Sequence, residues 1–401
     1  MNVGIYFETS KSTGGAHHQN ISLIQIFNKY LKNNYDFTYI VPNDEQKKIV
    51  ESRESKCVIF KKSLRFRIEQ FILKFNFFKA LYKKFSIKNS FESFLQSRKF
   101  DLIFFNAPYE ISTLVNETNF IIMLLSMQHR THGFFPEYKG KHDSETRDYI
   151  IDHAIKNSFK VFVGAEKDKE LLIKLFNAEK NKIIVQSYAF TLPSIYEKNK
   201  NFNFEKTLKK LDIPQNKNIL IYPAQFWAHK NHQYIIDIAL DFKKLNIKDI
   251  FFVFCGFDKG NLKVIKNKIT KYQLQEYIKI FNYLDDLELI SLYLKCFGVV
   301  MPSFVGHTTI PMYEAFYFKK NIFYTKGLSD DKLSSFLIEI DINNVFSFKE
   351  KYYEILKNKN DNTKRLENAK KFYDKYCDSK NTAENFKKVF EEYSHFKKTW
   401  S

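Results

Sequence analysis

The sequence contains few cysteines and no long uncharged apolar run. Its four cysteines, Cys57, Cys255, Cys296 and Cys377, lie far apart, and none forms a Cys-x-x-Cys pair. This spacing excludes a disulfide framework and a paired-cysteine zinc site, and it favours reduced thiols in the cytoplasm. No uncharged apolar run reaches the ~18 residues that a transmembrane helix needs. The first residues lead directly into a strand-like run, unlike a signal peptide.

Negative charge is also scarce relative to positive charge. The chain has 64 Lys and Arg against 45 Asp and Glu, a net charge of +19. Such an excess favours phosphorylated ligands, anionic lipid or nucleic acid as partners. Lys, Asn, Ile, Phe and Tyr are abundant together, which indicates a compositional bias, so the clustering of charge matters more than its total. A nucleic-acid-binding α/β protein is one alternative, although the sequence has no recognisable recognition module.

The length of 401 residues and the 44% hydrophobic content predict two domains with substantial cores. Short apolar runs alternate with helical periodicity in both halves, which predicts an α/β fold with parallel sheets. We expect an N-terminal domain over 1–195, a linker over 196–217 and a C-terminal domain over 218–380. A final helix over 381–401 completes the predicted organisation. The strands expected in the first half begin at residues 3, 37, 101, 120, 159 and 182.

The stretch 299–325 organises the second half. A buried strand over 297–301 is followed by a polar loop and then by a helix that begins at Pro311, since proline suits a first helical turn. A helix N-terminus at the carboxyl end of a parallel strand offers free N–H groups to a phosphate. Glu314, one turn into this helix, can accept hydrogen bonds from a ribose diol. The alternative is an ordinary βαβ unit with a surface glutamate.

This stretch resembles the donor site of GT-B glycosyltransferases, close to glycosyltransferase family 4. The family pattern is Pro-Ser, two residues, Glu-Gly-Phe-Gly-Leu-Pro, two residues, Glu-Ala, and the matching residues are Pro302, Ser303, Pro311, Glu314 and Ala315. The chain departs from it at Gly306, in place of the first glutamate. A sub-branch with Gly-Pro-Thr-Asn-(Ile/Leu)-Pro is more similar. The resemblance implies a nucleotide-sugar loop formed by Gly306, His307, Thr308, Thr309 and Ile310.

Two further segments of the second half carry the same resemblance. The segment 223–232, PAQFWAHKNH, is similar to the loop after the first strand of the family's C-terminal domain, with Gln225 and Lys230 at its two characteristic positions. Lysine suits a diphosphate because it is a mobile point charge. The strand 278–281 and the residues after it resemble the element that holds the base through backbone contacts. Those residues are Asn282, Tyr283 and Leu284.

The first half resembles the family more loosely. Gly14 and Gly15 form a glycine pair after the first strand, which is typical of GT-B N-terminal domains and equally of a plain tight turn. The segment 126–138, SMQHRTHGFFPEY, resembles a family segment through Gln128, His129, Arg130, Pro136 and Glu137. The family places this histidine beside the donor sugar, so the resemblance assigns that role to His129. His132 is a second candidate.

The segment 61–99 is basic and amphipathic. It has eleven Lys and Arg residues but only Glu69 and Glu92 as acids, with phenylalanine and leucine interleaved. This pattern predicts one or two amphipathic helices. Such helices can pack on the core with a solvated lysine face, or they can dock on anionic lipid headgroups. The sequence leaves both interpretations open.

The resemblance implies two Rossmann-like domains that face each other across a cleft, with the last helix crossing back to the first domain. It implies a retaining glycosyltransferase with Lys230, Glu314 and His129 as catalytic residues, a UDP- or GDP-sugar donor and a glycan or lipid-linked acceptor. We expect no cofactor, and no metal because the sequence lacks Asp-x-Asp. We expect no nucleic-acid partner, and we expect a cytoplasmic protein with a peripheral contact to the inner face of the membrane through 61–99. A phosphorylase, an epimerase and a non-catalytic partner subunit are the alternatives.

Overall fold

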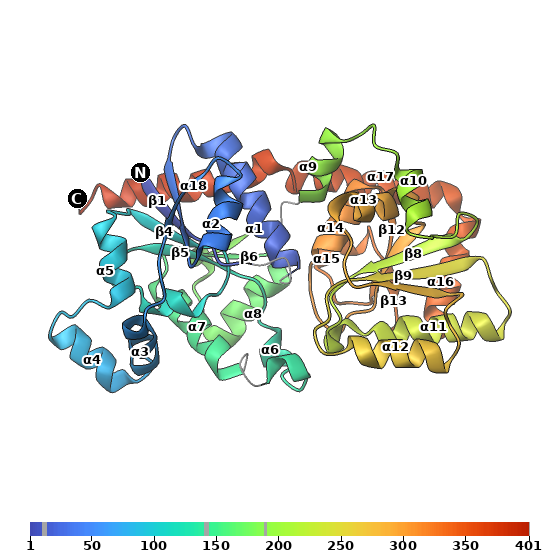
Figure 1. Ribbon diagram of the computed structural model, residues 1–401, viewed down its shortest axis with the longest axis horizontal. Helices are drawn as coiled ribbons and strands as arrows, with labels where there is room; N and C mark the ends of the chain where they lie inside the picture. Colours follow the sequence, from blue (N-terminus) through green and yellow to red (C-terminus); the bar gives the residue numbers. More distant parts are fainter. Residues whose placement is uncertain (10–13, 140–143, 188–190, 401) are drawn as a thin grey trace. The chain divides into compact units, whose positions relative to one another are not determined.

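The structure, a computed structural model, describes residues 1–9, 14–139, 144–187 and 191–400 (Figure 1). The chain divides into two compact units. Unit 1 comprises Met1–Thr131, Lys141–Ala189 and Ser379–Ser401. Unit 2 comprises His132–Gly140 and Phe190–Asp378. Each unit is built on its own parallel β-sheet.

The sheet of unit 1 has seven strands in the order β3-β2-β1-β4-β5-β6-β7, all parallel. Its central strands are apolar along their whole length because helices cover both faces of the sheet. The strands are β1 (Asn2–Tyr6), β2 (Asp36–Val41), β3 (Lys56–Ile59), β4 (Leu102–Phe105), β5 (Phe120–Leu124), β6 (Lys160–Val163) and β7 (Ile183–Val185).

Helices lie between these strands along the chain of unit 1. They are α1 (Gly15–Ile26), which continues as a π-helical turn (Phe27–Leu31), α2 (Asp44–Glu51), α3 (Leu64–Ile72), α4 (Asn76–Lys84), α5 (Ser90–Ser97), α6 (Gln128–Thr131), α7 (Ser144–Asn157) and α8 (Glu166–Phe176). Short 3-10 turns occupy Glu110–Leu114 and Lys180–Lys182.

The C-terminal helix α18 (Ser379–Lys397) packs on unit 1, although the residues before it belong to unit 2. The ring of Phe386 lies 4.6 Å from that of Phe162 and 5.0 Å from that of Phe27. The hydroxyl of Tyr393 donates to the carbonyl of Asp101 at 2.6 Å. The last helix therefore completes the core of the first unit, as the sequence predicted.

The sheet of unit 2 has six parallel strands in the order β10-β9-β8-β11-β12-β13. Its strands are β8 (Asn218–Pro223), β9 (Ile250–Cys255), β10 (Ile278–Phe281), β11 (Gly298–Met301), β12 (Asn321–Thr325) and β13 (Ile338–Ile340). The chain first adds strands on one side of β8 and then crosses to add β11 on the other side. The strand order therefore reverses between β8 and β11, which is the topological switch point of a doubly wound sheet.

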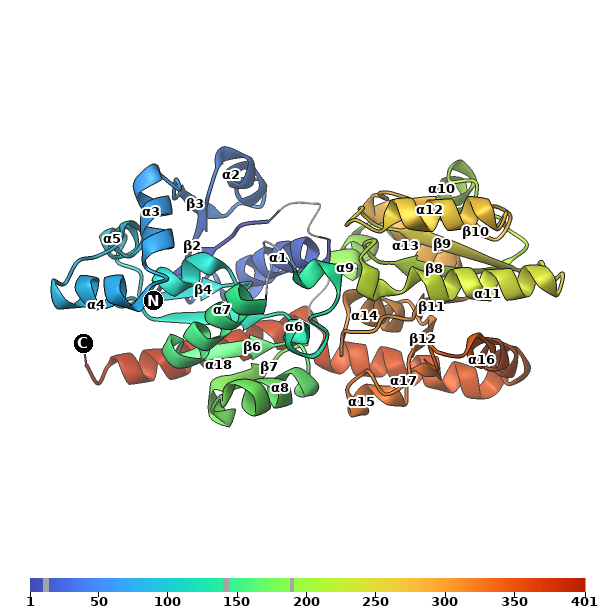
Figure 2. The same cartoon turned by 90° about the horizontal axis from the view of Figure 1, so that it is seen from below.

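The helices of unit 2 form two layers, which lie on either side of the sheet in Figure 1, and Figure 2 views the layer of α11 and α12 from the front. One layer contains α9, α10, α13, α14 and α17, and the other contains α11, α12 and α16. Their bounds are α9 (Thr191–Lys198), α10 (Phe204–Lys210), α11 (His232–Lys244), α12 (Leu262–Lys271), α13 (Asp286–Lys295), α14 (Ile310–Tyr317), α15 (Asp331–Ser334), α16 (Val345–Lys357) and α17 (Lys359–Tyr376). Short 3-10 turns occupy Pro136–Tyr138 and Ala228–Lys230.

Some observed elements differ from the predicted ones. The segment 61–99, predicted to form one or two helices, contains three, α3, α4 and α5. Strand β3 was not predicted, because it is a four-residue edge strand that is only half-buried and carries little apolar signal. The expected linker 196–217 contains α10, whose residues pack against α13 in unit 2. The segment 132–140, expected within the first domain, is grouped with unit 2. Both latter differences arise from long-range packing, which local sequence patterns do not encode.

The two sheets confirm the predicted class, α/β with two Rossmann-like domains. Among the described residues, no helix is long and apolar enough to cross a membrane.

Candidate functional site

The loops that follow β8 and β11 lie at the switch point of the unit 2 sheet. Strand β11 pairs directly with β8, with Val299 opposite Ile221. The carboxyl ends of both strands therefore meet at one edge of the sheet, and this edge is where α/β proteins bind ligands. The first loop leads to Lys230, and the second leads through Gly306 to helix α14.

Hydrogen bonds join these two loops into one structure. The hydroxyl of Tyr222 donates to the carbonyl of Lys230 at 2.8 Å and lies 2.9 Å from the hydroxyl of Ser303. The backbone N–H of Phe304 donates to the carbonyl of His229 at 3.0 Å. Both Tyr222 and Ser303 are buried. The position of Lys230 is thus tied to the loop after β11.

A third loop, which follows β9, supports the first one from the other side. A Cβ atom added at Gly256 would lie 2.4 Å from the carbonyl oxygen of Ala224 and 2.9 Å from the Cα of Gln225. Only glycine permits this approach of two backbones. The N–H of Phe226 donates to the carbonyl of Phe257 at 3.0 Å, which holds the two loops together.

Lys230 is half-buried at the end of the first loop. Its ammonium group has no hydrogen bond or ion pair within the described ranges. Burial lowers the pKa of Lys230 to about 8, and the nearby carboxylate of Glu137 opposes that shift. A desolvated cation that forms no direct ion pair favours the binding of an anion.

A buried histidine packs behind this lysine. The ring of His232 lies 4.8 Å from the rings of Tyr222 and Phe226 and 5.2 Å from that of Phe254. Burial, and then the charge of Lys230, lowers the pKa of His232 to about 3, so the imidazole is neutral. Its side chain therefore adds no competing charge to the site.

The segment 132–139 contributes a carboxylate that sequence reasoning did not place here. Glu137 accepts a hydrogen bond from the backbone N–H of His229 at 3.0 Å and contacts the ring Nδ1 of the same residue. The ring of Phe135 packs 5.5 Å from that of Phe304. Burial, followed by the charge of Lys230, lowers the pKa of His229 to about 4. In the sequence, Glu137 was noted only as part of the Pro-Glu pair that resembles the family segment. That pair does not indicate a contact with His229, which lies 92 positions away.

The loop after β11 approaches α14 with an unusual backbone. Gly306 has a φ of 113°, a conformation that other residues rarely adopt. The hydroxyl of Tyr324 donates to its carbonyl. His307 and Thr308 follow, and Thr309 occupies the N-cap of α14. No side-chain hydrogen bond from Thr309 satisfies the first N–H groups of α14, and these groups favour an anion.

Glu314 is buried one turn into α14, with 4% of its surface exposed. The hydroxyl of Tyr293 donates to its Oε2 at 2.8 Å. Burial raises the pKa of Glu314 to about 7, and the hydrogen bond from Tyr293 opposes this shift. The Oε1 atom makes no hydrogen bond with any described residue, so it remains available as an acceptor.

The residues predicted to hold a base lie after β10. Asn282, Tyr283 and Leu284 form the loop that connects this strand to α13. The ring of Tyr283 is half exposed and lies 5.6 Å from that of Phe257. The Oε1 of Gln225 accepts a hydrogen bond from the indole of Trp227 at 2.9 Å. Its role in binding the nucleotide sugar remains a prediction.

The predicted residues of unit 1 occupy separate places. His129 is buried in α6, where its Nε2 lies 2.9 Å from Oδ1 of Asp148, and burial lowers its pKa. Gly14 has a φ of 61° and caps α1, whose first residue is Gly15. The loop before Gly14, residues 10–13, lies outside the described residues. His132, the second candidate, belongs to unit 2 and interacts electrostatically with His307.

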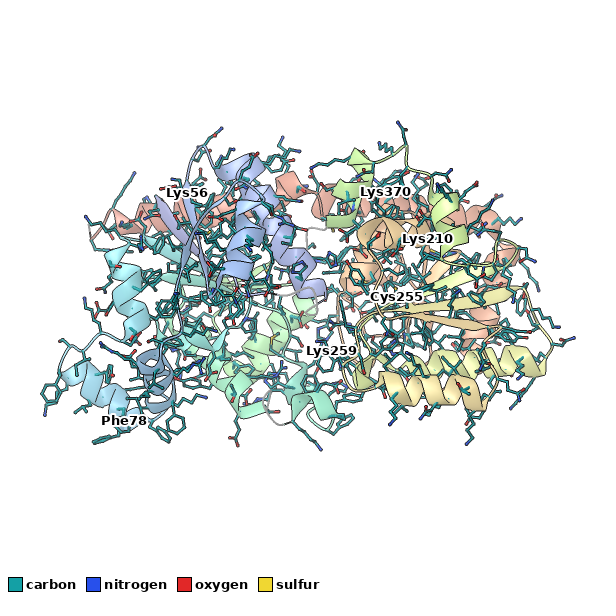
Figure 3. All side chains as sticks on the ribbon, in the orientation of Figure 1. Lys56, Phe78, Lys210, Cys255, Lys259 and Lys370 are labelled. Atoms are coloured by element: carbon teal, nitrogen blue, oxygen red, sulfur yellow. The ribbon has the colours of Figure 1, made fainter. Side chains whose placement is uncertain are left out.

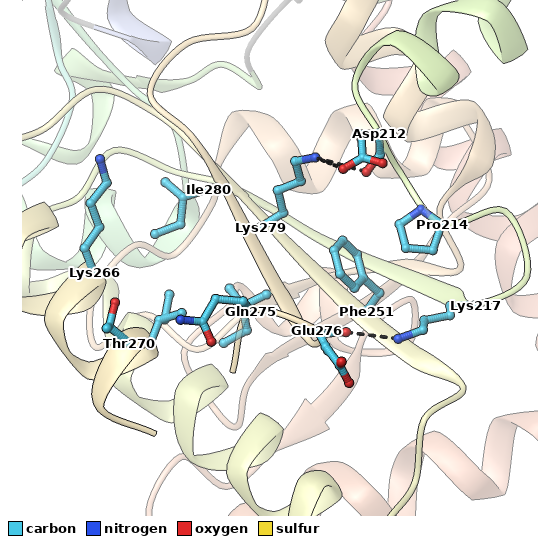
Figure 4. A pocket seen from close by; sticks show the side chains of 12 residues that line it. Asp212, Pro214, Lys217, Phe251, Lys266, Thr270, Gln275, Glu276, Lys279 and Ile280 are labelled. Atoms are coloured by element: carbon cyan, nitrogen blue, oxygen red, sulfur yellow. Dashed lines mark hydrogen bonds and ion pairs between the residues drawn. The ribbon is translucent and has the colours of Figure 1, made fainter. Parts of the chain in front are cut away.

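Two hollows of unit 2 lie away from these loops. One of about 620 Å³ is lined by residues at the amino ends of β9 and β10, including Phe251 and Ile278 (Figure 4). There Lys279 pairs with the exposed Asp212 at 2.7 Å. Sites in such sheets form at the opposite, carboxyl edge, so we do not assign a ligand to this hollow. The described residues contain no group of three His, Cys, Asp or Glu side chains that could hold a metal.

Replacement of Gly306 by glutamate, the commoner residue of the resembled family, is expected to lower stability and not to raise activity. The positive φ costs a residue with a side chain roughly 1–3 kcal/mol. Thermal unfolding and activity should be compared with Gly306→Ala, which has the same backbone strain without the carboxylate. A Gly306→Glu variant that melts like the parent protein and works faster would contradict this account of the loop.

Comparison with known structures defines the fold as that of GT-B glycosyltransferases. HepE from Anabaena in complex with UDP-glucose has a TM-score of 0.70 at 13% identity, covering 98% of this chain and 100% of that one. Sucrose-phosphate synthase from Thermosynechococcus elongatus has a TM-score of 0.71 at 12% sequence identity, and the match covers 98% of both chains. UDP-GlcNAc 2-epimerase from Neisseria meningitidis has a TM-score of 0.61 at 13% sequence identity, and the match covers 98% of this chain and 100% of that one.

Residues 203–372 match the family model described as "Glycosyl transferases group 1". This range contains Lys230, Glu314 and both loops at the switch point. No curated protein matches the chain by sequence.

Proposed function

We propose that this protein is a glycosyltransferase that transfers a sugar from a nucleotide-sugar donor to a glycan or lipid-linked glycan. The observation that carries the proposal is the presence of two desolvated groups at the switch point of unit 2. Lys230 forms no hydrogen bond or ion pair with a described residue, and the Oε1 of Glu314 forms no hydrogen bond with one. A diphosphate and a ribose are the chemical groups that such a cation and such an acceptor bind.

In this proposal the donor spans the loops of unit 2. The diphosphate lies between Lys230 and the N-terminus of α14, and the ribose hydroxyls donate to Glu314. The backbone of residues 282–284 holds the base. The family match over 203–372 and the UDP-glucose complex of HepE support a nucleotide sugar as the donor. UDP is therefore the first nucleotide to test.

The reaction breaks the bond between the anomeric carbon and the donor phosphate oxygen, and it forms a bond from that carbon to an acceptor hydroxyl oxygen. Negative charge grows on the departing diphosphate, where Lys230 and the helix N-terminus can stabilise it. The acceptor proton passes to the leaving phosphate, and the configuration at the anomeric carbon is retained. No side-chain base is then required. His129 would contact the donor sugar, as the family resemblance implies.

A ligand screen tests the proposal directly. The full chain should be heated with UDP-, GDP-, ADP- and CMP-sugars, and one base should raise the melting temperature, because a ligand at about 100 times its Kd stabilises a protein by ~2.7 kcal/mol. Product analysis by NMR should then show transfer with retention. Absence of a shift with every nucleotide would overturn the proposal. Conversion of the donor sugar without transfer would indicate an epimerase, a class that shares the fold.

The activity is expected to persist in excess EDTA. Lys230 and the α14 N-terminus supply the positive charge that a metal supplies in other enzymes, and the sequence has no Asp-x-Asp clamp. Transfer rates should be measured with EDTA, with added manganese and without either. Loss of activity on chelation that manganese restores would contradict the role given to Lys230.

A further inference from the structure

The segment 61–99 exposes apolar side chains in unit 1. The large ones are Leu64, Ile68, Phe71, Phe75, Phe77, Phe85 and Ile87. Exposed apolar residues scattered singly are ordinary, but these seven fall within two adjacent helices and their connections. Helices α3 and α4 lie beside each other at one edge of unit 1, with Phe78 of α4 labelled there (Figures 1 and 3).

Each of these helices has an inner and an outer apolar face. On α3, Phe66 is buried, whereas Leu64, Ile68 and Phe71, at helical spacing, are exposed by 76%, 52% and 63%. On α4, Phe78 packs against the core cluster, and Phe77 is 71% exposed. The core accounts for the inner faces only. The outer faces therefore require a different explanation from core packing.

The acidic residues of the segment are turned inward. Glu69 is 3% exposed and accepts hydrogen bonds from Arg65 at 2.9 Å and from the N–H of Ser90 at 2.7 Å. Glu92 is 1% exposed and accepts from the N–H groups of Asn116 and Thr118. No carboxylate of the segment therefore faces solvent.

Three cations of the same segment, Lys61, Arg67 and Lys84, are exposed and form no ion pair with a described residue. Lys84 lies over the exposed ring of Phe85, 5.7 Å from its centroid. Other lysines of the segment pair with carboxylates outside it: Lys62 with Glu8, Lys74 with Glu110 and Lys88 with Glu117. The outer surface thus combines large apolar side chains with unpaired cations, which is the composition of helices that lie in a bilayer interface.

We propose that this surface, formed by Leu64, Ile68, Phe71 and Phe77 with Lys61, Arg67 and Lys84, docks the protein on an anionic lipid bilayer. The apolar side chains enter the acyl boundary, and the cations contact the headgroup phosphates. The proposal does not depend on the donor site in unit 2. It goes beyond the transferase proposal by naming the surface at which a lipid-linked acceptor would be met.

The positive charge of the segment 61–99 favours an anionic bilayer, rather than a second copy of this chain, as the occupant of this surface. The segment has eleven basic and two acidic residues, and both acids are buried. A symmetric dimer through this surface would bring like charges together, because each copy presents the same patch. An anionic membrane offers both the apolar layer and the complementary charge.

Vesicle sedimentation tests the proposal with the full chain. Binding to vesicles of phosphatidylcholine with phosphatidylglycerol is expected, with much weaker binding to phosphatidylcholine alone. Salt at about 0.5 M should weaken it, since exposed charges are screened. Phe77→Ser and Arg67→Glu should each reduce the partition coefficient about tenfold. Matched controls are Val264→Ser and Lys263→Glu, which alter exposed residues of α12 in unit 2.

Two results would overturn the proposal. One is absence of binding to anionic vesicles at low salt, and the other is equal binding by the parent and both variants of the patch. Sedimentation velocity of the free protein shows whether it is a dimer. If the parent protein is a dimer that does not bind vesicles, and Phe77→Ser dissociates it, the surface belongs to a second copy of the chain. Melting temperatures show that the variants fold. Nucleotide-induced stabilisation should be unchanged in all of them, so failure of this proposal and failure of the donor proposal are separable.

Discussion

Replacement of Lys230 by alanine is expected to lower kcat by about 100- to 1,000-fold, the loss typical of removing one group that stabilises developing negative charge. Donor affinity should fall far less, because the charge on the leaving diphosphate is greatest in the transition state. The fold should persist, since the backbone carbonyl of Lys230 still accepts the bond from Tyr222. Lys263→Ala, on the exposed face of α12, is the matched control.

Calorimetry with the nucleotide and steady-state kinetics separate these effects. Weaker binding with an unchanged kcat would mean that Lys230 stabilises the ground state and the transition state equally, and no change in either quantity would remove it from the site. Thermal stability gives an independent check. Because the folded pKa is about 8 against an ordinary value of 10.5, the unfolded chain binds the proton more tightly. The buried charge destabilises the fold below pH 8, so the alanine variant should not melt lower at pH 7.

The same lysine predicts the alkaline limb of the pH profile. The amine is charged below its pKa of about 8, so kcat/KM is expected to fall as pH rises through that value. Arginine stays protonated over this range. The limb should therefore disappear in Lys230→Arg, even if that variant is slower at every pH.

Replacement of Glu314 by glutamine is expected to weaken nucleotide-sugar binding about 10- to 150-fold, because losing a charged hydrogen-bond partner costs roughly 1.5–3 kcal/mol. The amide keeps an oxygen for the hydroxyl of Tyr293, so the local packing is preserved. It cannot accept from both ribose hydroxyls as the carboxylate can.

Stability should move in the opposite direction from affinity. The folded pKa of Glu314 is about 7, above the ordinary 4.5, so the unfolded chain releases its proton first. Stability is therefore lost as pH rises from about 4.5 to 7, and the penalty is complete above 7. Glutamine carries no such charge, and Glu314→Gln should melt at or above the parent temperature at pH 8. Donor affinity of the parent should rise through pH 7, and this dependence should vanish in the variant.

Tyr293→Phe provides the control, since it removes the hydroxyl but leaves both carboxyl oxygens. Because the lost hydrogen bond opposes the raised pKa of Glu314, donor affinity should fall near pH 7 and approach that of the parent at higher pH, where the carboxylate is ionised in both proteins. Should Glu314→Gln bind the nucleotide as tightly as the parent protein, Glu314 is not the ribose ligand and the donor site proposed for unit 2 fails.

The sequence by itself determined the class of fold and the elements around the site. Strands buried on both faces read as continuous apolar runs, and those at β4, β5 and β11 were predicted within a residue or two. Pro311 marked the start of α14, and local spacing placed Lys230 and Glu314 after the correct strands. These features depend on neighbouring residues, so a single chain displays them.

Tertiary structure alone decided which distant residues meet and what charge they hold. The contact between Glu137 and His229 joins residues 92 positions apart, and that between Tyr222 and Ser303 joins residues 81 apart. The pKa values of Lys230 and Glu314 follow from burial, which depends on the whole packed unit. In the segment 61–99 the sequence supplied the charge and the apolar residues, but only packing showed that its acids face inward while Phe71, Phe75, Phe77 and Phe85 face outward. Burial is a property of the assembled fold, whereas the sequence specifies only what is available to be buried.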